Sequence, residues 1–198
     1  AIRVPASAPA RRLLVAVGVP VAAPSANKSG QLSPTEARHV AEGFGDEVAL
    51  VLDGGSCSVG LESTVLDLST ETPTLLRAGG VTHETLEEVI GGPVVLAGID
   101  DHAPKSPGML SRHYAPRTPL RMNAAGVADG EALLGFGGSL GAIADLSPAS
   151  DLVEAAANLF RMLHELDGLG YVGIAVAPIP ENGLGRAIND RLRRATHS

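Results

Sequence analysis

The chain has 198 residues, of which 44% are hydrophobic and 3% aromatic, and its formal net charge is -7. This apolar content excludes a disordered tail, the single cysteine excludes a disulfide scaffold, and the acidic balance excludes a globally basic nucleic-acid binder. The length allows one large domain or two small domains with buried cores.

The charge is unevenly distributed along the chain. Residues 103–121 contain cations but no acidic residue, and they lie between two acidic stretches; the cations are Lys105, Arg112, Arg117 and Arg121. No apolar run reaches the roughly 20 residues of a membrane-spanning helix. The run after Arg11-Arg12 is broken by Gly18 and Pro20, which argues against a signal peptide. We therefore expect a cytoplasmic protein without a membrane anchor.

Alternating helical and strand patterns in the first half of the chain predict an α/β fold. Helices are expected over 8–17, from Ser33 to about Gly43 or Gly45, and over 82–90; strands are expected over 19–23, 48–53, 63–68, 74–77 and 94–96. Ser33 is the predicted cap of the second helix, because Pro34 suits the first helical position and Glu36 completes a capping box.

Residues 97–118 follow no period and contain three prolines, which predicts a functional linker. Beyond this segment the α/β pattern returns, with strands expected over 133–136, 142–146 and 173–177 and helices over 149–166 and 184–195. The chain is therefore expected to divide into a first domain over 1–98, a linker over 99–118 and a second domain over 119–198.

The loop over 24–31 is small and polar, and it follows a predicted buried strand. Ser25 and its polar neighbours could contact a ligand, and the free N–H groups of a helix beginning at Ser33 suit an anion such as phosphate. An ordinary strand-to-helix connection explains the same spacing.

A second loop, over 53–60, contains three glycines and leads to Ser63 at the start of a predicted strand. Such glycines permit tight turns or a close backbone approach to a ligand, and a plain glycine-rich hairpin explains them equally well. Arg77, at a strand end, could bind phosphate with its planar fork or form a surface ion pair. The segment around His113 and Tyr114 could fold over a nucleotide or serve as a solvated tether.

Covalent, metal and dinucleotide chemistry find little support in the sequence. The second loop lacks a Gly-x-Ser-x-Gly elbow, and Cys57 has no histidine nearby in sequence. The six histidines lack metal-ligand spacing, and in the run from Gly135 to Gly141 the third glycine comes one residue late for a dinucleotide fingerprint. No catalytic nucleophile and no metal ligand is predicted.

Taken in order, six segments resemble the YrdC-like threonylcarbamoyl-AMP synthase family in its long two-domain form. They are IRVP (2–5), PVAAPSANKSGQLSPT (20–35), DGGSCSVGLESTVLDL (53–68), LLRAGG (75–80), SPGMLSRHYAP (106–116) and GLGRAINDRLRRA (183–195). The resemblance implies the C-terminal part of a YrdC-like twisted-sheet α/β domain, a linker over its active site, and a smaller Rossmann-like α/β accessory domain. It also implies that the catalytic domain begins upstream of Ala1, so that this chain alone would be inactive.

The family forms threonylcarbamoyl-AMP and pyrophosphate from L-threonine, bicarbonate and ATP, and the product serves threonylcarbamoyladenosine modification of tRNA. The resemblance implies threonine-binding roles for Arg3, Ala23 and Ser63, with Arg3 at the carboxylate. It implies ATP-binding roles for Ser25, Ser33, Arg77 and Tyr114, with His113 as the neighbouring possibility. Mg²⁺ is expected on the ATP phosphates, and tRNA-modifying machinery is expected downstream.

A non-catalytic RNA-binding or regulatory YrdC-like module is the competing interpretation, and a Rossmann-type dehydrogenase is a distant third. The chain has only two lysines and few aromatics, so that outside 103–121 it offers little surface for RNA. We therefore expect no stable nucleic-acid binding.

Overall fold

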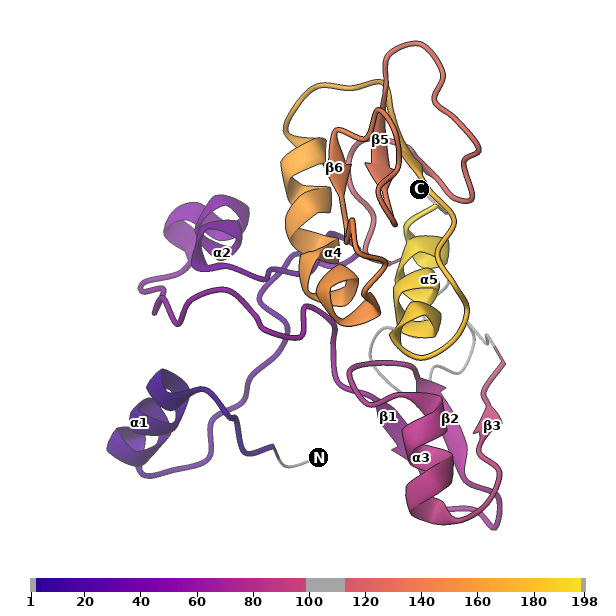
Figure 1. The fold of residues 1–198 in the computed structure, drawn as a ribbon. Helices are drawn as coiled ribbons and strands as arrows, with labels where there is room; N and C mark the ends of the chain where they lie inside the picture. The colour runs from indigo at the N-terminus through magenta and orange to yellow at the C-terminus, as the bar shows by residue number, and fades with distance from the viewer. Residues whose placement is uncertain (1–2, 99–112, 197–198) are drawn as a thin grey trace.

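The computed structural model describes residues 3–98 and 113–196. These residues form a mixed α/β structure with two separate sheets, as the sequence pattern predicts (Figure 1). The first part of the predicted linker, with Lys105 and Arg112, lies outside the described residues, as does Ile2.

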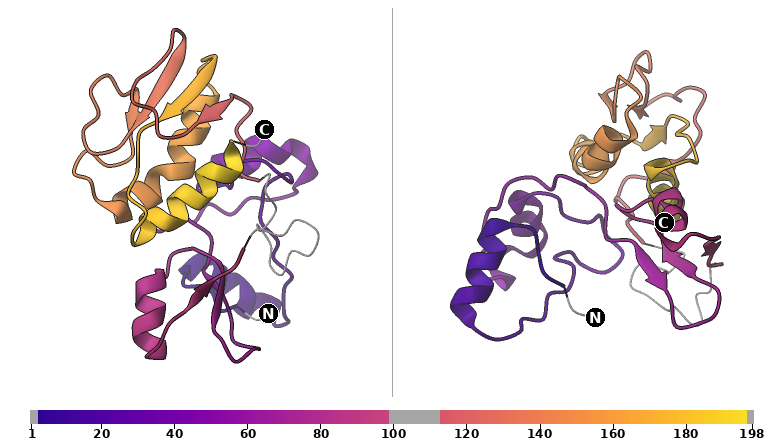
Figure 2. Two further views of the ribbon diagram at one scale, coloured as in Figure 1. Left: turned by 90° about the vertical axis from the view of Figure 1, so that its right-hand side faces the viewer. Right: turned by 60° about the horizontal axis from the view of Figure 1, so that its bottom comes forward.

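Helices α1 (Ala8–Val17) and α2 (Ala37–Phe44), with the short 3-10 helix η1 (Gly45–Glu47), lie apart from both sheets (Figures 1 and 2). The bounds of α1 agree with the prediction. Its start is capped by the Ser7 hydroxyl, which accepts a hydrogen bond from the Ala10 N–H. No residue of α1 is buried, so tertiary packing contributes little to this helix.

Two predicted strands are wrong. Residues 19–23 and 48–53 form no strand, and most of their apolar side chains are exposed; Val21 is 49% exposed and Leu52 54%. A strand depends on pairing with a neighbouring strand, and no described segment pairs with either of these. Sequence patterning reports the apolar character of a segment and carries no information about its pairing partner.

The predicted helix start at Ser33 is also wrong. Helix α2 begins at Ala37, and Glu36, at the N-cap, makes no side-chain capping bond. The Ser33 hydroxyl instead donates to Glu62 over 2.5 Å, and Glu36 pairs with Arg38. The capping box fails because Ser33 binds a distant carboxylate and Glu36 binds Arg38, two residues along the chain.

The first sheet has the order β1-β2-β3, with β1 and β2 antiparallel and β2 and β3 parallel. Its strands are β1 (Val65–Asp67), β2 (Thr74–Arg77) and β3 (Val95–Leu96), joined between β2 and β3 by α3 (His83–Ile90). The Thr82 hydroxyl caps α3 by accepting from the Thr85 N–H, and Gly91 ends it with φ 71°. These elements agree with the prediction to within two residues at each end.

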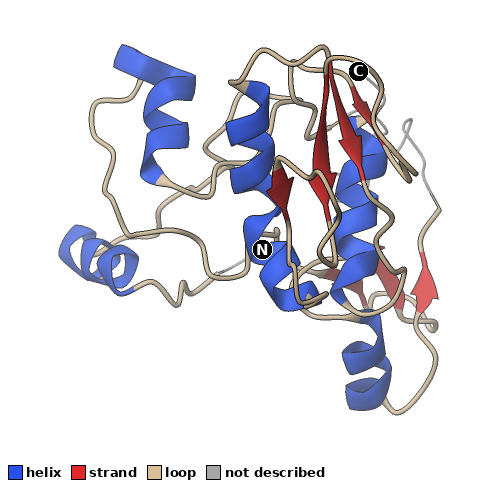
Figure 3. Ribbon diagram, turned by 45° about the horizontal axis from the view of Figure 1, so that its top comes forward, coloured by secondary structure: helices blue, strands red, loops and turns tan. Residues whose placement is uncertain are grey.

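The second sheet is parallel throughout and has the order β4-β7-β5-β6. Its strands are β4 (Leu120–Arg121), β5 (Glu131–Gly135), β6 (Ala144–Asp145) and β7 (Gly173–Val176). Helices α4 (Leu152–Asp167) and α5 (Leu184–Ala195) contact one another and pack against this sheet (Figure 3). The two-residue strand β4 was not predicted, because it is too short to carry a period.

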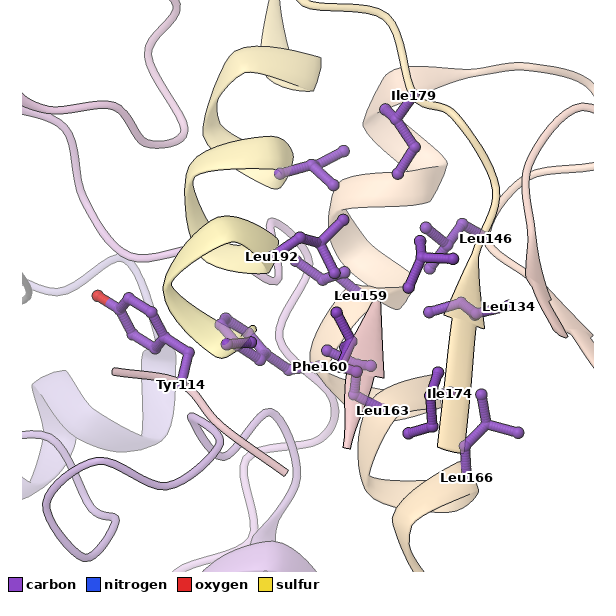
Figure 4. Packing of buried hydrophobic residues seen from close by; sticks show 14 of the residues in the cluster. Tyr114, Leu134, Leu146, Leu159, Phe160, Leu163, Leu166, Ile174, Ile179 and Leu192 are labelled. Carbon is purple, nitrogen blue, oxygen red and sulfur yellow. The ribbon is translucent and has the colours of Figure 1, made fainter. Parts of the chain in front are cut away.

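The hydrophobic core lies between this second sheet and its two helices. Leu134, Leu159 and Ile174 are fully buried in it, and Tyr114 lies at its edge beside Phe160 and α5 (Figure 4). Leu32, from the first half of the chain, also belongs to this core. The second sheet is thus the packed centre to which a segment of the first half is attached.

Candidate functional site

Arg77 binds the backbone at Ser63, so one predicted ATP-binding residue meets one predicted threonine-binding residue. Its Nε and Nη2 atoms both donate to the Ser63 carbonyl oxygen, over 3.0 and 2.9 Å. The antiparallel pairing of Val65 with Arg77 sets this approach. A Cβ atom on Gly79 would lie 2.3 Å from the Glu62 carbonyl oxygen, so the segment 62–64 also packs directly on the backbone that follows Arg77.

Glu62 connects Ser33 to the second half of the chain. One carboxylate oxygen accepts from the Ser33 hydroxyl over 2.5 Å, and the other accepts from Arg191 Nε over 2.8 Å. Burial alone would raise the pKa of Glu62, but the charge of Arg191 and the Ser33 hydrogen bond lower it below its usual value. Glu62 is therefore an ionised, partly buried bridge between the two halves.

Arg191 lies on α5, with its side chain only 1% exposed. Its guanidinium carbon lies 5.2 Å from the centre of the Tyr114 ring, and its Nη1 donates to Asp190 over 2.8 Å. Burial opposes its charge, but Glu62, Tyr114 and Asp190 together raise its pKa. A cation in this position stabilises both the carboxylate and the face of the aromatic ring.

Tyr114 is held in an unusual backbone conformation, with φ 62°, and is 1% exposed. Its ring lies 5.6 Å from that of Phe160 and 4.0 Å from that of His113, the latter edge-to-face. Burial raises the pKa of Tyr114 and lowers that of His113, which favours the neutral form of each. Both rings are thus fixed, uncharged groups among the charges of Glu62 and Arg191.

The loop over 24–31 is tied to the residue that follows Tyr114. The Ala115 N–H donates to the Gly30 carbonyl over 2.9 Å, and Gln31 and Ala115 form a parallel bridge. Within the loop, Asn27 Nδ2 donates to the Gln31 carbonyl over 3.2 Å. Ser25 is exposed in this loop. The Gly30–Ala115 hydrogen bond therefore links the backbone of the loop that carries Ser25 to the backbone next to Tyr114.

Arg3 and Ala23, two residues predicted to bind threonine, contact one another. Arg3 Nη2 donates to the Ala23 carbonyl over 3.4 Å, and both residues are exposed. Within residues 3–98 and 113–196, no hydrogen bond or ion pair joins this pair to Ser63. The structure therefore brings the predicted residues into two groups: Arg3 with Ala23, and Ser33, Ser63, Arg77, His113 and Tyr114 around Glu62 and Arg191.

Sequence reasoning missed Glu62 and Arg191, which link the second group. Both lie within quoted motifs, but they are 129 residues apart, and no periodicity or spacing relates them. The predicted phosphate site at a helix beginning at Ser33 is absent from the structure. The helix begins later, and the Thr35 N–H, one of the groups meant for an anion, donates to His39 Nδ1 over 3.2 Å.

The described parts of the chain contain neither a metal-binding cluster nor a membrane-spanning helix. No group of three or more His, Cys, Asp or Glu side chains there could hold a metal ion. None of the helices within 3–98 and 113–196 has both the length and the apolar character needed to cross a membrane.

The chain matches two protein families along its length. Residues 81–197 match the family described as "Threonylcarbamoyl-AMP synthase, C-terminal domain", and residues 1–79 match the family described as "Telomere recombination". The threonylcarbamoyl-AMP synthase of Pyrococcus abyssi is 40% identical over 99% of this chain and 63% of its own length. That of Bacillus subtilis is 37% identical over 98% of this chain and 62% of its own length. The chain thus spans about 60% of the length of these relatives.

Two solved structures have the same fold. The crystal structure of P. abyssi Sua5 complexed with L-threonine matches with a TM-score of 0.85 and 36% identity, over 98% of this chain and 63% of that one. A variant of P. abyssi Sua5, with an adjacent histidine and tyrosine replaced by alanine, matches with a TM-score of 0.82 and 35% identity, over 98% of this chain and 62% of that one.

Proposed function

Because this chain belongs to the threonylcarbamoyl-AMP synthase family, we propose that it forms threonylcarbamoyl-AMP and pyrophosphate from L-threonine, bicarbonate and ATP. The observation that carries the proposal is the assembly of Ser33, Ser63, Arg77 and Tyr114 around the Glu62–Arg191 pair. These four are among the residues that the family resemblance assigns to the two substrates.

The threonine site is proposed at Arg3, Ala23 and Ser63. A guanidinium fork binds a carboxylate with two parallel hydrogen bonds, and Arg3 uses one of its nitrogens on the Ala23 carbonyl. Ala23 leaves space for a small amino acid, and the Ser63 hydroxyl offers one polar contact. A P. abyssi relative has been solved with L-threonine, which supports this substrate for the chain.

The ATP site is proposed at Ser25, Ser33, Arg77 and Tyr114, with His113 beside the tyrosine. An oxygen of N-carboxythreonine, formed from threonine and bicarbonate with loss of water, attacks the α-phosphorus of ATP, and pyrophosphate leaves. Such a reaction depends on positioning two anions and neutralising their charge, and no covalent enzyme intermediate is needed. Mg²⁺ is proposed to enter with the ATP phosphates, which it commonly binds together with only one or two carboxylates.

A second observation supports the proposed role of Tyr114 in the ATP site. In this chain, histidine is followed directly by tyrosine only at His113-Tyr114, and a P. abyssi relative has been solved with such a pair replaced by alanine. Tyr114 is buried beside Phe160 and Arg191, and the charge of Arg77 acts to lower the pKa of its phenol against the larger effect of burial.

We further propose that residues 1–98 belong to the catalytic domain, that 99–118 link it to the second domain, and that 119–198 form an accessory domain. Two separate sheets, on either side of residues 99–118, support this division. The reaction is proposed to occur in the cytoplasm, where the product would pass to tRNA-modifying machinery.

The competing function, an RNA-binding module, is less favoured by the described surface. The arginines of α5 are engaged by acidic partners: Arg186 with Glu84, Arg191 with Glu62, Arg193 with Glu181 and Arg194 with Asp190. A phosphate backbone would have to displace these carboxylates, so the helix offers little net positive charge. A salt-dependent tRNA affinity in the submicromolar range would favour the competing function.

The test is conversion of ATP to pyrophosphate by the full gene product that contains this sequence. We expect pyrophosphate release to require both L-threonine and bicarbonate, with serine and valine as poor replacements. Equal turnover with and without threonine would contradict the proposal.

A further inference from the structure

Arg191 lies where burial of its charge has a large free-energy cost. Its side chain is 1% exposed, and its Nη2 atom is buried without a hydrogen-bond partner among the described residues. A buried ion pair of this kind contributes little net stability, since desolvation offsets most of its attraction. An apolar side chain of similar volume would serve packing alone, so stability does not account for the placement of this cation.

The contacts of Arg191 lead to two residues of the proposed ATP site. Through Nε it holds Glu62 over 2.8 Å, and Glu62 in turn binds the Ser33 hydroxyl over 2.5 Å. Its guanidinium carbon lies 5.2 Å from the Tyr114 ring centre. One side chain from α5 therefore fixes a hydroxyl on one segment and an aromatic ring on another.

Tyr114 needs such a constraint. Its φ of 62° lies in the left-handed region, which a residue with a bulky side chain adopts only when its surroundings enforce it. Phe160 supports the ring on one side, and the Gly30–Ala115 hydrogen bond fixes the backbone after it. Arg191 contributes the contact that depends on charge.

We propose that Arg191 is a positioning residue for the ATP site, holding Tyr114 directly and Ser33 through Glu62. This inference rests on the proposed function. It assigns the second sheet and its helices a role in the reaction: α5 orders the nucleotide-binding side chains of the first half without touching the nucleotide.

The first experiment measures the position of Tyr114 without any activity. The experiment uses the full gene product, and the fluorescence of Tyr114 is the difference between the emission with Tyr114 present and that of the matching Tyr114→Phe variant. In this difference signal we expect Arg191→Met to raise the acrylamide quenching constant about twofold, because the ring loses its cover. The matched control is Arg193→Met on the same helix, where the ion pair with Glu181 is exposed; it should leave quenching unchanged.

The second experiment measures steady-state kinetics of the full gene product. Arg191→Met is expected to raise the KM for ATP about tenfold, equivalent to about 1.4 kcal/mol, with the KM for threonine changed less than about twofold. Arg191→Lys keeps the charge but loses the planar guanidinium group. Its KM for ATP should therefore lie between that of the unmodified protein and that of Arg191→Met. Glu62→Gln should act in the same direction, and the double variant should be no worse than the more severe single variant.

The outcomes separate the two proposals. If the unmodified protein lacks threonine-dependent pyrophosphate release, the proposed function fails, and quenching still decides whether Arg191 holds Tyr114. If the unmodified protein is active but Arg191→Met matches Arg193→Met in quenching and in KM for ATP, the positioning role is wrong. A lower melting temperature with unchanged quenching and unchanged KM for ATP also overturns it, because that result describes a purely structural arginine.

Discussion

His39 and His164 stack face to face, with ring centres 3.9 Å apart and planes inclined by 15°. The pair joins α2 to α4 and so connects the two halves of the chain. The Thr35 N–H donates to His39 Nδ1, and His164 Nε2 lies 3.2 Å from the Ser33 carbonyl oxygen. Ser33 is thus held from both sides, by this pair through its backbone and by Glu62 through its hydroxyl.

The histidine pair predicts acid sensitivity of this junction. Burial lowers the pKa of His39, reinforced by His164 and Arg38 and opposed by Glu36 and Glu42. Burial also lowers the pKa of His164, although the Ser33 carbonyl, Asp167 and Glu42 oppose the shift. Protonation would place two cations in contact and cost the Thr35 hydrogen bond.

Because the pKa of each histidine is depressed in the folded state, the unfolded state binds more protons below its value of 6.5. Stability should be complete above pH 6.5 and fall as the pH drops from there through the folded pKa values. We expect the urea midpoint to decrease between pH 7.5 and 5.5. In His39→Phe/His164→Phe the decrease should be smaller; an equal decrease in that variant would locate the titration elsewhere.

Gly60 predicts a large and local stability effect. Its φ is 70°, and a Cβ atom there would lie 2.2 Å from the Ala156 carbonyl oxygen on α4. Gly60→Ala should therefore cost about 3 kcal/mol in free energy of unfolding, through strain and a clash with helix backbone. Gly55→Ala is the matched control, since Gly55 has φ 81° but open space around it, and should cost only about 1 kcal/mol. Similar costs at both sites would show that backbone conformation alone governs Gly60.

Arg77 predicts an effect on activity that a lysine cannot rescue. Two of its nitrogens share the Ser63 carbonyl, and a lysine can supply only one flexible point charge. Arg77→Lys is expected to lower kcat/KM of the full gene product about tenfold or more, measured as pyrophosphate release. The control is Arg117→Lys, because the Arg117 side chain is 84% exposed beside Asp167; it should change kcat/KM less than about twofold. Full activity of Arg77→Lys would show that activity does not depend on the two-nitrogen contact of Arg77 with the Ser63 carbonyl.

Asp151 predicts a smaller effect, confined to stability. Its carboxylate caps α4 by accepting from the N–H groups of Val153 and Glu154, over 2.7 and 3.4 Å. Asp151→Ala should lower the free energy of unfolding by about 1 kcal/mol, measured by urea denaturation. Asp129→Ala, in an exposed turn, is the reference and should stay within about 0.5 kcal/mol of the parent. A cost at Asp129 equal to that at Asp151 would rule out the cap as the cause.

Long periodic elements could be predicted from the sequence. Helices α1 and α5 have the predicted bounds, and β2 agrees with the predicted strand. Each is specified locally, by apolar spacing or by glycine at its end. The predicted strands over 19–23 and 48–53 failed because a strand also requires a partner, which local pattern does not supply.

The proposed ligand-binding residues were named by family resemblance, but their arrangement in space was not predicted. Nothing in the sequence relates Glu62 to Arg191, or His39 to His164. The capping box at Ser33 satisfied every local rule and was still overridden by Glu62.

The sequence by itself therefore determined the α/β class, most helices and the identity of the motifs, because these depend on residues a few positions apart. The tertiary structure decided which motif residues meet, because a charge-assisted hydrogen bond between distant segments outweighs a local cap. In this chain that competition places Ser33, Glu62, Arg191 and Tyr114 in one connected group.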